Sequence, residues 1–250
     1  MRVLDQPAIV LHASRWRETS LLVEAFTHEH GRVGLLARGV TGPRKQPLRA
    51  ALQPLQRVRI DYAQRGELAQ LTRAEVGATA PMLGGEALLA GLYLCELTLR
   101  MLPRDDAHPT LFLRFAQALD DLVDAPSLAW TLRRFERDLL GVLGFAPELH
   151  RDVHGGALDP LGRYRVDPEH GPLRVADSGA GVRGAIRGAA LLALADEAPP
   201  SAELLREQRL ALRQIIAHHL GGRGLRSWGL LAEFAELVRD DRTATVQPGK

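Results

Sequence analysis

The sequence predicts an α+β protein made of two unlike parts: a five-stranded OB-type β-barrel over residues 1–80 and an α-helical bundle domain over residues 81–240. The first part holds five short apolar segments separated by turn residues, and none has the length or period of a helix that could cover a sheet. Beyond Pro81 the apolar residues recur at helical spacing. Residues 241–250 are mostly polar, and we expect this tail to fray.

The expected strands lie at residues 8–12, 20–27, 32–38, 52–62 and 67–76. His30 and Gly31 form a tight connection between the second strand and the third. Val58 and Ile60 alternate with arginines, which is the pattern of a strand with one buried face. A closed barrel removes the exposed edges of such short strands, and OB-type barrels frequently bind single-stranded nucleic acid.

The segment after the third strand is the strongest functional lead in the barrel. Gly42, Pro43 and Pro47 interrupt both helical and strand patterns, so we expect an irregular loop. No acidic residue lies between Arg32 and Pro54. Cations on a flexible loop with a rigid base suit a polyanionic backbone. The candidate DNA contacts are the basic residues of this loop and of the neighbouring strands: Arg38, Arg44, Lys45, Arg49, Arg57, Arg59 and Arg65.

The charge distribution agrees with that assignment. Residues 1–80 hold twelve basic and seven acidic side chains, whereas the other 170 residues hold twenty and twenty-three. Aromatic residues that could stack on bases are sparse in the barrel, namely Trp16, Phe26 and Tyr62. The sequence therefore predicts salt-sensitive binding to the phosphate backbone with little base preference. The alternatives are an ordinary solvated basic loop, or RNA in place of DNA, since phosphate contacts barely distinguish the sugars.

In the second part we expect helices at residues 85–102, 110–123, 128–144, 185–196, 202–220 and 227–238. The third of these has Leu128, Leu132, Phe135 and Leu139 at spacings of three and four, with Ser127 as its N-cap. Residues 146–184 form an irregular insert rich in glycine and proline, with short strands near residues 164–166 and 173–175. This insert contains no cysteine.

Other chemistries find weaker support. Gly179–Gly184 reads G-x-G-x-x-G, so a nucleotide-dependent enzyme is one rival, but no second parallel strand follows the next helix. His150, His154 and His170 raise the question of a metal, although polar loop histidines are the commoner explanation. We expect no catalysis, no cofactor and no metal. The other rival is a helical scaffold that binds protein without DNA contact.

The single Cys95 excludes an internal disulfide and a cysteine zinc cluster. The longest apolar run, near residues 87–94, is too short to span a bilayer, and no N-terminal signal pattern is visible. We therefore expect a cytoplasmic protein without membrane contact.

Several blocks in the same order resemble the RecO family of recombination mediators. They are VLHASRWRETSLLVEAFTHEHGRVGLLARGV, ALQPLQ, RGELAQLTRAE, GLYLCELTLRML, LRRFERDLLGVLGF and HHLGGRGLRS. The resemblance implies an N-terminal OB-fold, a helical domain and no enzymatic site. It implies a nucleoid-associated protein that binds single- and double-stranded DNA and anneals complementary strands. Together with RecR, such proteins help to load RecA onto DNA coated by single-strand-binding protein (SSB).

The resemblance also implies a site for the acidic, Phe-ended C-terminal tail of SSB. The matching block suggests that arginines meet the tail carboxylates beside an apolar pocket. The candidate residues are Leu132, Arg133, Arg134, Phe135 and Leu139. Many family members carry a four-cysteine zinc module at the position of the insert. The cysteine-free insert here is similar to the zinc-lacking branch.

Overall fold

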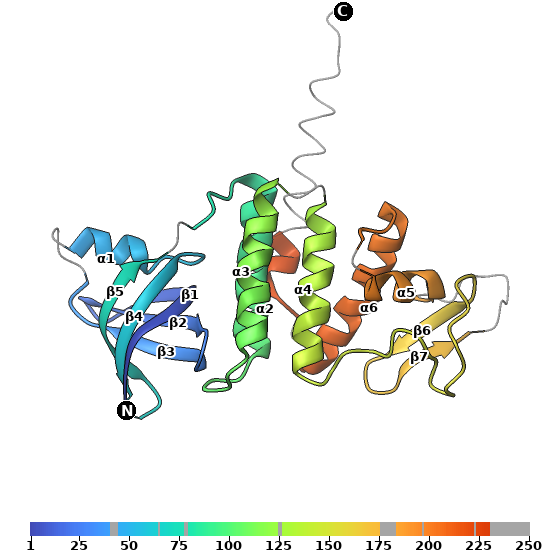
Figure 1. The fold of residues 1–250 in the computed structure, drawn as a ribbon, viewed down its shortest axis with the longest axis horizontal. Helices are drawn as coiled ribbons and strands as arrows, with labels where there is room; N and C mark the ends of the chain where they lie inside the picture. Colours follow the sequence, from blue (N-terminus) through green and yellow to red (C-terminus); the bar gives the residue numbers. More distant parts are fainter. Residues whose placement is uncertain are drawn as a thin grey trace, which may run out of the picture.

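The computed structural model describes residues 1–40, 45–64, 66–77, 80–124, 127–175, 184–196, 198–222 and 224–230. Its elements form a row, with the barrel at one end, helices in the middle and a small sheet at the other end (Figure 1). No helix among these residues combines the length and apolar character needed to cross a membrane. The last expected helix, at 227–238, and the tail at 241–250 lie largely or wholly outside the described residues.

Five strands close the N-terminal barrel in the order β1-β2-β3-β5-β4, which confirms the predicted fold class. The strands are β1 (Arg2–Trp16), β2 (Ser20–Thr27), β3 (Gly31–Ala37), β4 (Arg57–Gln64) and β5 (Ala69–Val76). All pairs are antiparallel except β3 with β5. Strand β1 is longer than expected because it pairs with β2 along its second half and with β4 along its first. A register shift beside Asp5, whose φ is 52°, bends it between these two partners.

The expectation that no helix interrupts the basic segment was wrong. Residues Gln46–Ala51 form a short helix, α1, with Pro47 in its first turn. A proline is tolerated there because its missing N–H would have no partner within the helix. Leu48, Ala51 and Leu52 pack into the barrel core, so packing fixes the helix. The segment before Arg57, expected as the start of the fourth strand, is consequently not part of β4.

The helices of the second part are α2 (Gly85–Met101), α3 (Pro109–Asp124), α4 (Leu128–Val142), α5 (Gly188–Ala195) and α6 (Ala202–His219). The small sheet contains β6 (Arg163–Asp167), β7 (Gly171–Arg174) and β8 (Ile186–Arg187) in the order β7-β6-β8. Both of its pairings are antiparallel. Of the G-x-G-x-x-G residues only Gly184 is described, and it leads into an antiparallel strand, which is not the parallel context of a dinucleotide site.

The barrel and the helices are joined by a shared core. Ile9 and Phe26 of the barrel belong to the same buried cluster as α2, α3 and α4. The Phe26 ring packs edge-on against Phe112 and Phe115 of α3, at centroid distances of 5.5 and 6.1 Å. A second cluster fills the barrel interior. One side of the barrel is therefore fixed against the helices, and the side that carries α1 faces away from them (Figure 1).

Candidate binding surfaces

Exposed cations lie at the end of β3 and along α1. Arg38 directly follows β3, and Lys45 and Arg49 lie one helical turn apart at the start and in the last turn of α1. All three side chains are exposed, and none forms an ion pair with another described residue. Arg44 and Arg65, the other loop candidates, lie outside the described residues. The free cations of this segment are thus available to an anionic ligand.

Arg57 and Arg59 are placed differently from the expected patch. The Arg57 guanidinium is 16% exposed, donates to the Ala116 carbonyl oxygen at 2.7 Å and pairs with Asp120 at 2.8 Å. It therefore fastens β4 to α3. Arg59 donates through Nε to the Asp5 carboxylate at 2.6 Å, and this contact lowers the pKa of Asp5 and raises that of Arg59. Unlike those of the loop cations, both guanidinium groups already have acidic partners.

At the tip of the β1–β2 hairpin, the two arginines beside Trp16 were missed, although Trp16 itself was named as a residue that could stack on bases. Arg15, Trp16 and Arg17 are all exposed, and neither arginine pairs with a described acid. Trp16 is 43% exposed, whereas Phe26 and Tyr62 are 0% and 1% exposed. Of the three aromatic candidates in the barrel, two are core residues and one faces solvent. The sequence Arg-Trp-Arg beside a turn was the signal available for this site.

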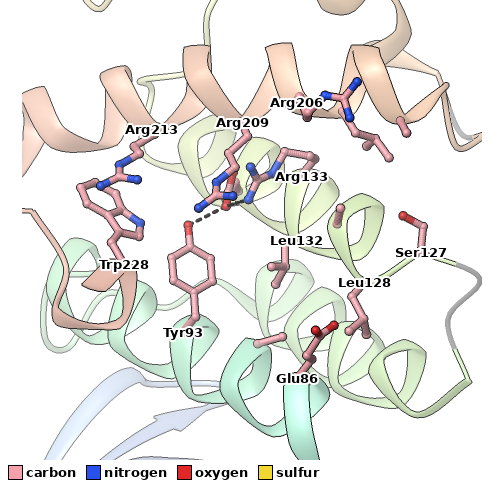
Figure 2. Close-up of a pocket in the computed structure, with 15 residues that line it drawn as sticks. Glu86, Tyr93, Ser127, Leu128, Leu132, Arg133, Arg206, Arg209, Arg213 and Trp228 are labelled. Atoms are coloured by element: carbon pink, nitrogen blue, oxygen red, sulfur yellow. Dashed lines mark hydrogen bonds and ion pairs between the residues drawn. The ribbon is translucent and has the colours of Figure 1, made fainter. Parts of the chain in front are cut away.

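The main cavity of the helical domain is a groove of about 460 Å³ between α2, α4, α6 and the segment near Trp228. Its apolar lining includes Ala90, Leu128, Leu132 and Leu205. Three exposed arginines of α6 line the same groove: Arg206, Arg209 and Arg213. Figure 2 shows Arg209 extending from α6 toward Tyr93 and Arg133, Arg213 lying over Trp228, and Arg206 remaining beside α6. A groove with an apolar floor and a cationic rim fits a ligand with both apolar and acidic groups.

A buried acid organises these cations. Glu136 of α4 is 1% exposed and accepts hydrogen bonds from the Tyr93 hydroxyl at 2.5 Å and from the Arg133 guanidinium. Burial raises the pKa of the Glu136 carboxyl, while the charge of Arg133, the Tyr93 hydrogen bond and the charge of Arg209 oppose that rise. The Arg213 guanidinium lies 4.4 Å from the centroid of the Trp228 ring. The Arg213 end of the rim is thus held by the indole ring, and Arg209 faces the charge of the buried acid.

The expected tail-binding block is divided between several environments. Leu132 and Arg133 line the groove. Phe135 and Leu139 are core residues, and the Phe135 ring packs 5.3 Å from that of Phe115. Arg134 lines a different, small depression between α3 and α4. The α6 arginines at spacings of three and four, within LLREQRLALR, were the signal that could have found the rest of the groove.

The insert is held by aspartates in its turns. Asp152, Asp159 and Asp167 each accept backbone N–H bonds from residues two to four positions ahead, at 2.9–3.0 Å. His170 contacts Asp167 at 2.9 Å, and His150 and His154 lie exposed elsewhere in the insert. Within the described ranges, no group of three or more His, Cys, Asp or Glu side chains is arranged to hold a metal ion.

Known proteins match both parts of this fold. The family models described as Recombination protein O N terminal and Recombination protein O C terminal match residues 1–79 and 83–229. DNA repair protein RecO of Xanthomonas oryzae pv. oryzae strain PXO99A is 53% identical, over 94% of this chain and 99% of that protein. DNA repair protein RecO of Stenotrophomonas maltophilia strain K279a is 52% identical, over 94% and 99%. With both parts matched in order, the chain belongs to the RecO family of recombination proteins.

Proposed function

We propose that this chain is a DNA repair and recombination protein that acts by binding rather than by catalysis. It holds the phosphate backbone of single- or double-stranded DNA on the barrel and a protein tail in the helical groove. The observation that carries the proposal is the contrast among the barrel cations. Arg38, Lys45 and Arg49 are exposed without an acidic partner in the described chain, whereas Arg57 and Arg59 are paired.

A salt titration tests the DNA surface. Each phosphate neutralised on a single strand contributes about 0.7 to the slope of log K against log salt concentration. The double variant Lys45→Ala, Arg49→Ala is expected to bind an oligonucleotide more weakly and to lose roughly 1.4 from the magnitude of that slope. Arg59→Ala is the matched control because its guanidinium is occupied by Asp5. An unchanged slope in the double variant would remove α1 from the DNA surface and favour a protein-binding scaffold.

The groove is proposed to bind the C-terminal tail of SSB. An aromatic ring fits the floor beside Leu132 and Leu205, and carboxylates meet Arg206, Arg209 and Arg213 at the rim. Arg133 contributes less directly than the sequence suggested, because its guanidinium is bound to Glu136. Its proposed role is structural: it pairs with the buried Glu136 in the wall of the groove.

The tail site is tested with a fluorescent acidic peptide that ends in phenylalanine. Loss of a hydrogen bond to a charged group typically costs about 1.5–3 kcal/mol, so Arg209→Ala is expected to weaken peptide binding by about 10- to 100-fold. Arg134→Ala, in the depression between α3 and α4, serves as the matched control. An equal loss in both variants would place the peptide outside the groove. Affinity for naked DNA is expected to stay near normal in both.

Strand annealing follows physically from the barrel proposal. Two DNA strands repel each other through their phosphates, and bound cations reduce that repulsion so that bases can pair. We propose that the tail contact brings the protein to SSB-coated DNA, where with RecR it helps to load RecA. Fluorescence-monitored annealing of complementary oligonucleotides, with and without SSB, tests this. The Lys45→Ala, Arg49→Ala variant is expected to slow annealing in both conditions, and Arg209→Ala only when SSB is present.

A further inference from the structure

We propose that Trp16 is a stacking platform for one unpaired base, and that it makes the barrel prefer single-stranded over double-stranded DNA. This inference rests on the proposed binding of DNA at the barrel and adds a base contact to it. A site that contacts only phosphates does not detect whether the bases of the bound DNA are paired or unpaired. An exposed aromatic side chain does, because the face of an unpaired base is free to stack on it.

Strand register places Trp16 on the outer face of the barrel, in line with the free cations. Trp16 of β1 pairs with Ser20 of β2 across the hairpin. The next residue of β2, Leu21, pairs with Ala37 of β3. Arg38 therefore follows at the level of Ser20, and the Val40 N–H donates to the Thr19 carbonyl at 2.8 Å. Side chains of directly paired residues project from the same face. Ala37 is buried and Arg38 exposed, so Arg38 lies on the outer face with Trp16.

The outer face next to Trp16 has an apolar surface that neither core uses. Ser14 pairs with Leu22, and Leu22 pairs with Leu36, which makes a second row beside that of Trp16. Both leucines are half-buried and belong to neither of the two hydrophobic clusters of the described chain. The outer face of the second and third strands is also the face with which OB-type barrels bind oligonucleotides.

The charges around Trp16 indicate which ligand uses it. Arg38 lies on the same outer face as Trp16, while Arg15 and Arg17 adjoin Trp16 in the chain and Arg15, paired with Leu21, projects from the opposite face. None of these three arginines has an acidic partner among the described residues. An aromatic ring bordered by free arginines fits a nucleotide, with the base on the ring and the adjacent phosphates on the guanidinium groups. In a duplex the bases are already stacked and paired, so their faces are closed to the indole. Double-stranded DNA then gains the phosphate contacts alone.

The test measures the affinity of the full chain and of Trp16→Ala for three probes of equal length: an oligothymidylate, a duplex, and a strand of abasic sugar-phosphate units. Trp16→Ala is expected to weaken oligothymidylate binding by about 5- to 100-fold, in line with the loss of one stacked base. Binding of the duplex and of the abasic strand should change by less than about twofold, since neither offers an open base face. The salt slope should stay at its original value, because no cation is removed.

Two further variants separate stacking from folding and from the parent proposal. Trp16→Phe keeps an aromatic face and is expected to retain most of the preference for oligothymidylate, whereas loss equal to that of Trp16→Ala would overturn the inference. Equal weakening for the duplex and the abasic strand in Trp16→Ala would overturn it too. Failure of the DNA proposal is recognised independently, because Lys45→Ala, Arg49→Ala would then leave the salt slope unchanged.

Discussion

The barrel end and the helical groove are both cationic, but their arginines are held in different ways. On the barrel, the side chains of Arg38, Lys45 and Arg49 are exposed and have no acidic partner in the described chain. In the groove, Arg133 is bound to a buried glutamate, Arg213 lies on an indole ring, and Arg209 faces the same glutamate from α6 (Figure 2). The first surface is open and the second is concave.

This difference determines what each surface can bind. Unpaired cations on an open surface can bind a long polyanion in many positions. Their contribution to its affinity depends on the salt concentration. Cations fixed around an apolar cavity suit a short ligand with one orientation, because little side-chain entropy is lost on binding. These properties support our proposal of a polynucleotide on the barrel and the end of a peptide in the groove.

The largest expected effect comes from removing the acid beneath the groove. Glu136→Ala leaves the buried guanidinium of Arg133 without its partner. Breaking a buried pair from one side typically costs about 3–5 kcal/mol, and we expect a loss of that size in the free energy of unfolding, measured by urea denaturation. The matched change on the barrel is Asp5→Ala, which breaks the exposed pair with Arg59 and should cost much less, because solvent screens exposed ion pairs.

Glu136→Gln provides the control for that comparison. Glutamine keeps an oxygen that can accept from Tyr93 and Arg133 at nearly the same size, so it should retain part of the lost stability. If Glu136→Ala were as mild as Asp5→Ala, the groove cations would not depend on a buried acid, and the contrast between the two surfaces would fail.

Two glycines allow a comparison between the side of the barrel that packs against the helical part and the side that does not. Gly31 has φ 66°, and a Cβ atom built on it would lie 1.9 Å from the Asp106 carbonyl oxygen at the helical interface. Gly39 has φ 64°, with nothing within 4 Å of its Cβ position. The left-handed backbone alone costs an alanine about 1–2 kcal/mol. Gly39→Ala should therefore lose about that much, and Gly31→Ala clearly more, in thermal or urea unfolding.

The glycine pair also has a functional readout. Gly39 lies next to Arg38 and far from any close contact, so Gly39→Ala should stiffen the basic segment without detaching the barrel. Gly31→Ala should instead loosen the barrel from α3, detectable as faster limited proteolysis between residues 77 and 85. Equal stability losses in the two variants would mean that the interface at Asp106 yields readily.

The sequence predicted the barrel and the helices well because local patterns determine both. Alternation and turn residues place the strands, and spacings of three and four place α4 and α6. The short helix α1 was missed because its apolar residues are few and it contains Pro47. It is stabilised by contact with the barrel core, which no local pattern reveals.

The binding surfaces were predictable only in part, for a physical reason. Exposure of Lys45 and Arg49 follows from their neighbours in the chain, but the pairing of Arg57 with Asp120 depends on how β4 meets α3. The groove likewise needs α2, α4 and α6 side by side, so of the tail-binding candidates predicted from α4 alone only Leu132 and Arg133 line it. Tertiary packing decides which arginines of a sequence are free and which are paired.

The smallest expected effect is a pH dependence at the far end of α6. The His219 ring stacks on Phe145 at 3.8 Å, and its Nε2 atom is buried without a hydrogen-bond partner. Burial, with the neighbouring charge of His218, lowers the pKa of His219 below its ordinary value of 6.5. The folded protein therefore binds this proton less readily than the unfolded chain. Its contribution to stability is present above pH 6.5 and is lost as the pH falls through the folded-state pKa.

We expect hydrogen exchange at the end of α6 and in the β6–β7 turn to accelerate as the pH falls below 6.5, after correction for the intrinsic rate. Asp167 stays ionised throughout this range because the His170 hydrogen bond and backbone N–H groups lower its pKa to about 2, so it does not cause the change. His219→Gln removes the titrating group and should abolish the dependence. Helix α1 contains no histidine and its arginine does not titrate in this range, so exchange in α1 should not respond. A response of equal size in α1 would show that the two ends of the molecule open together.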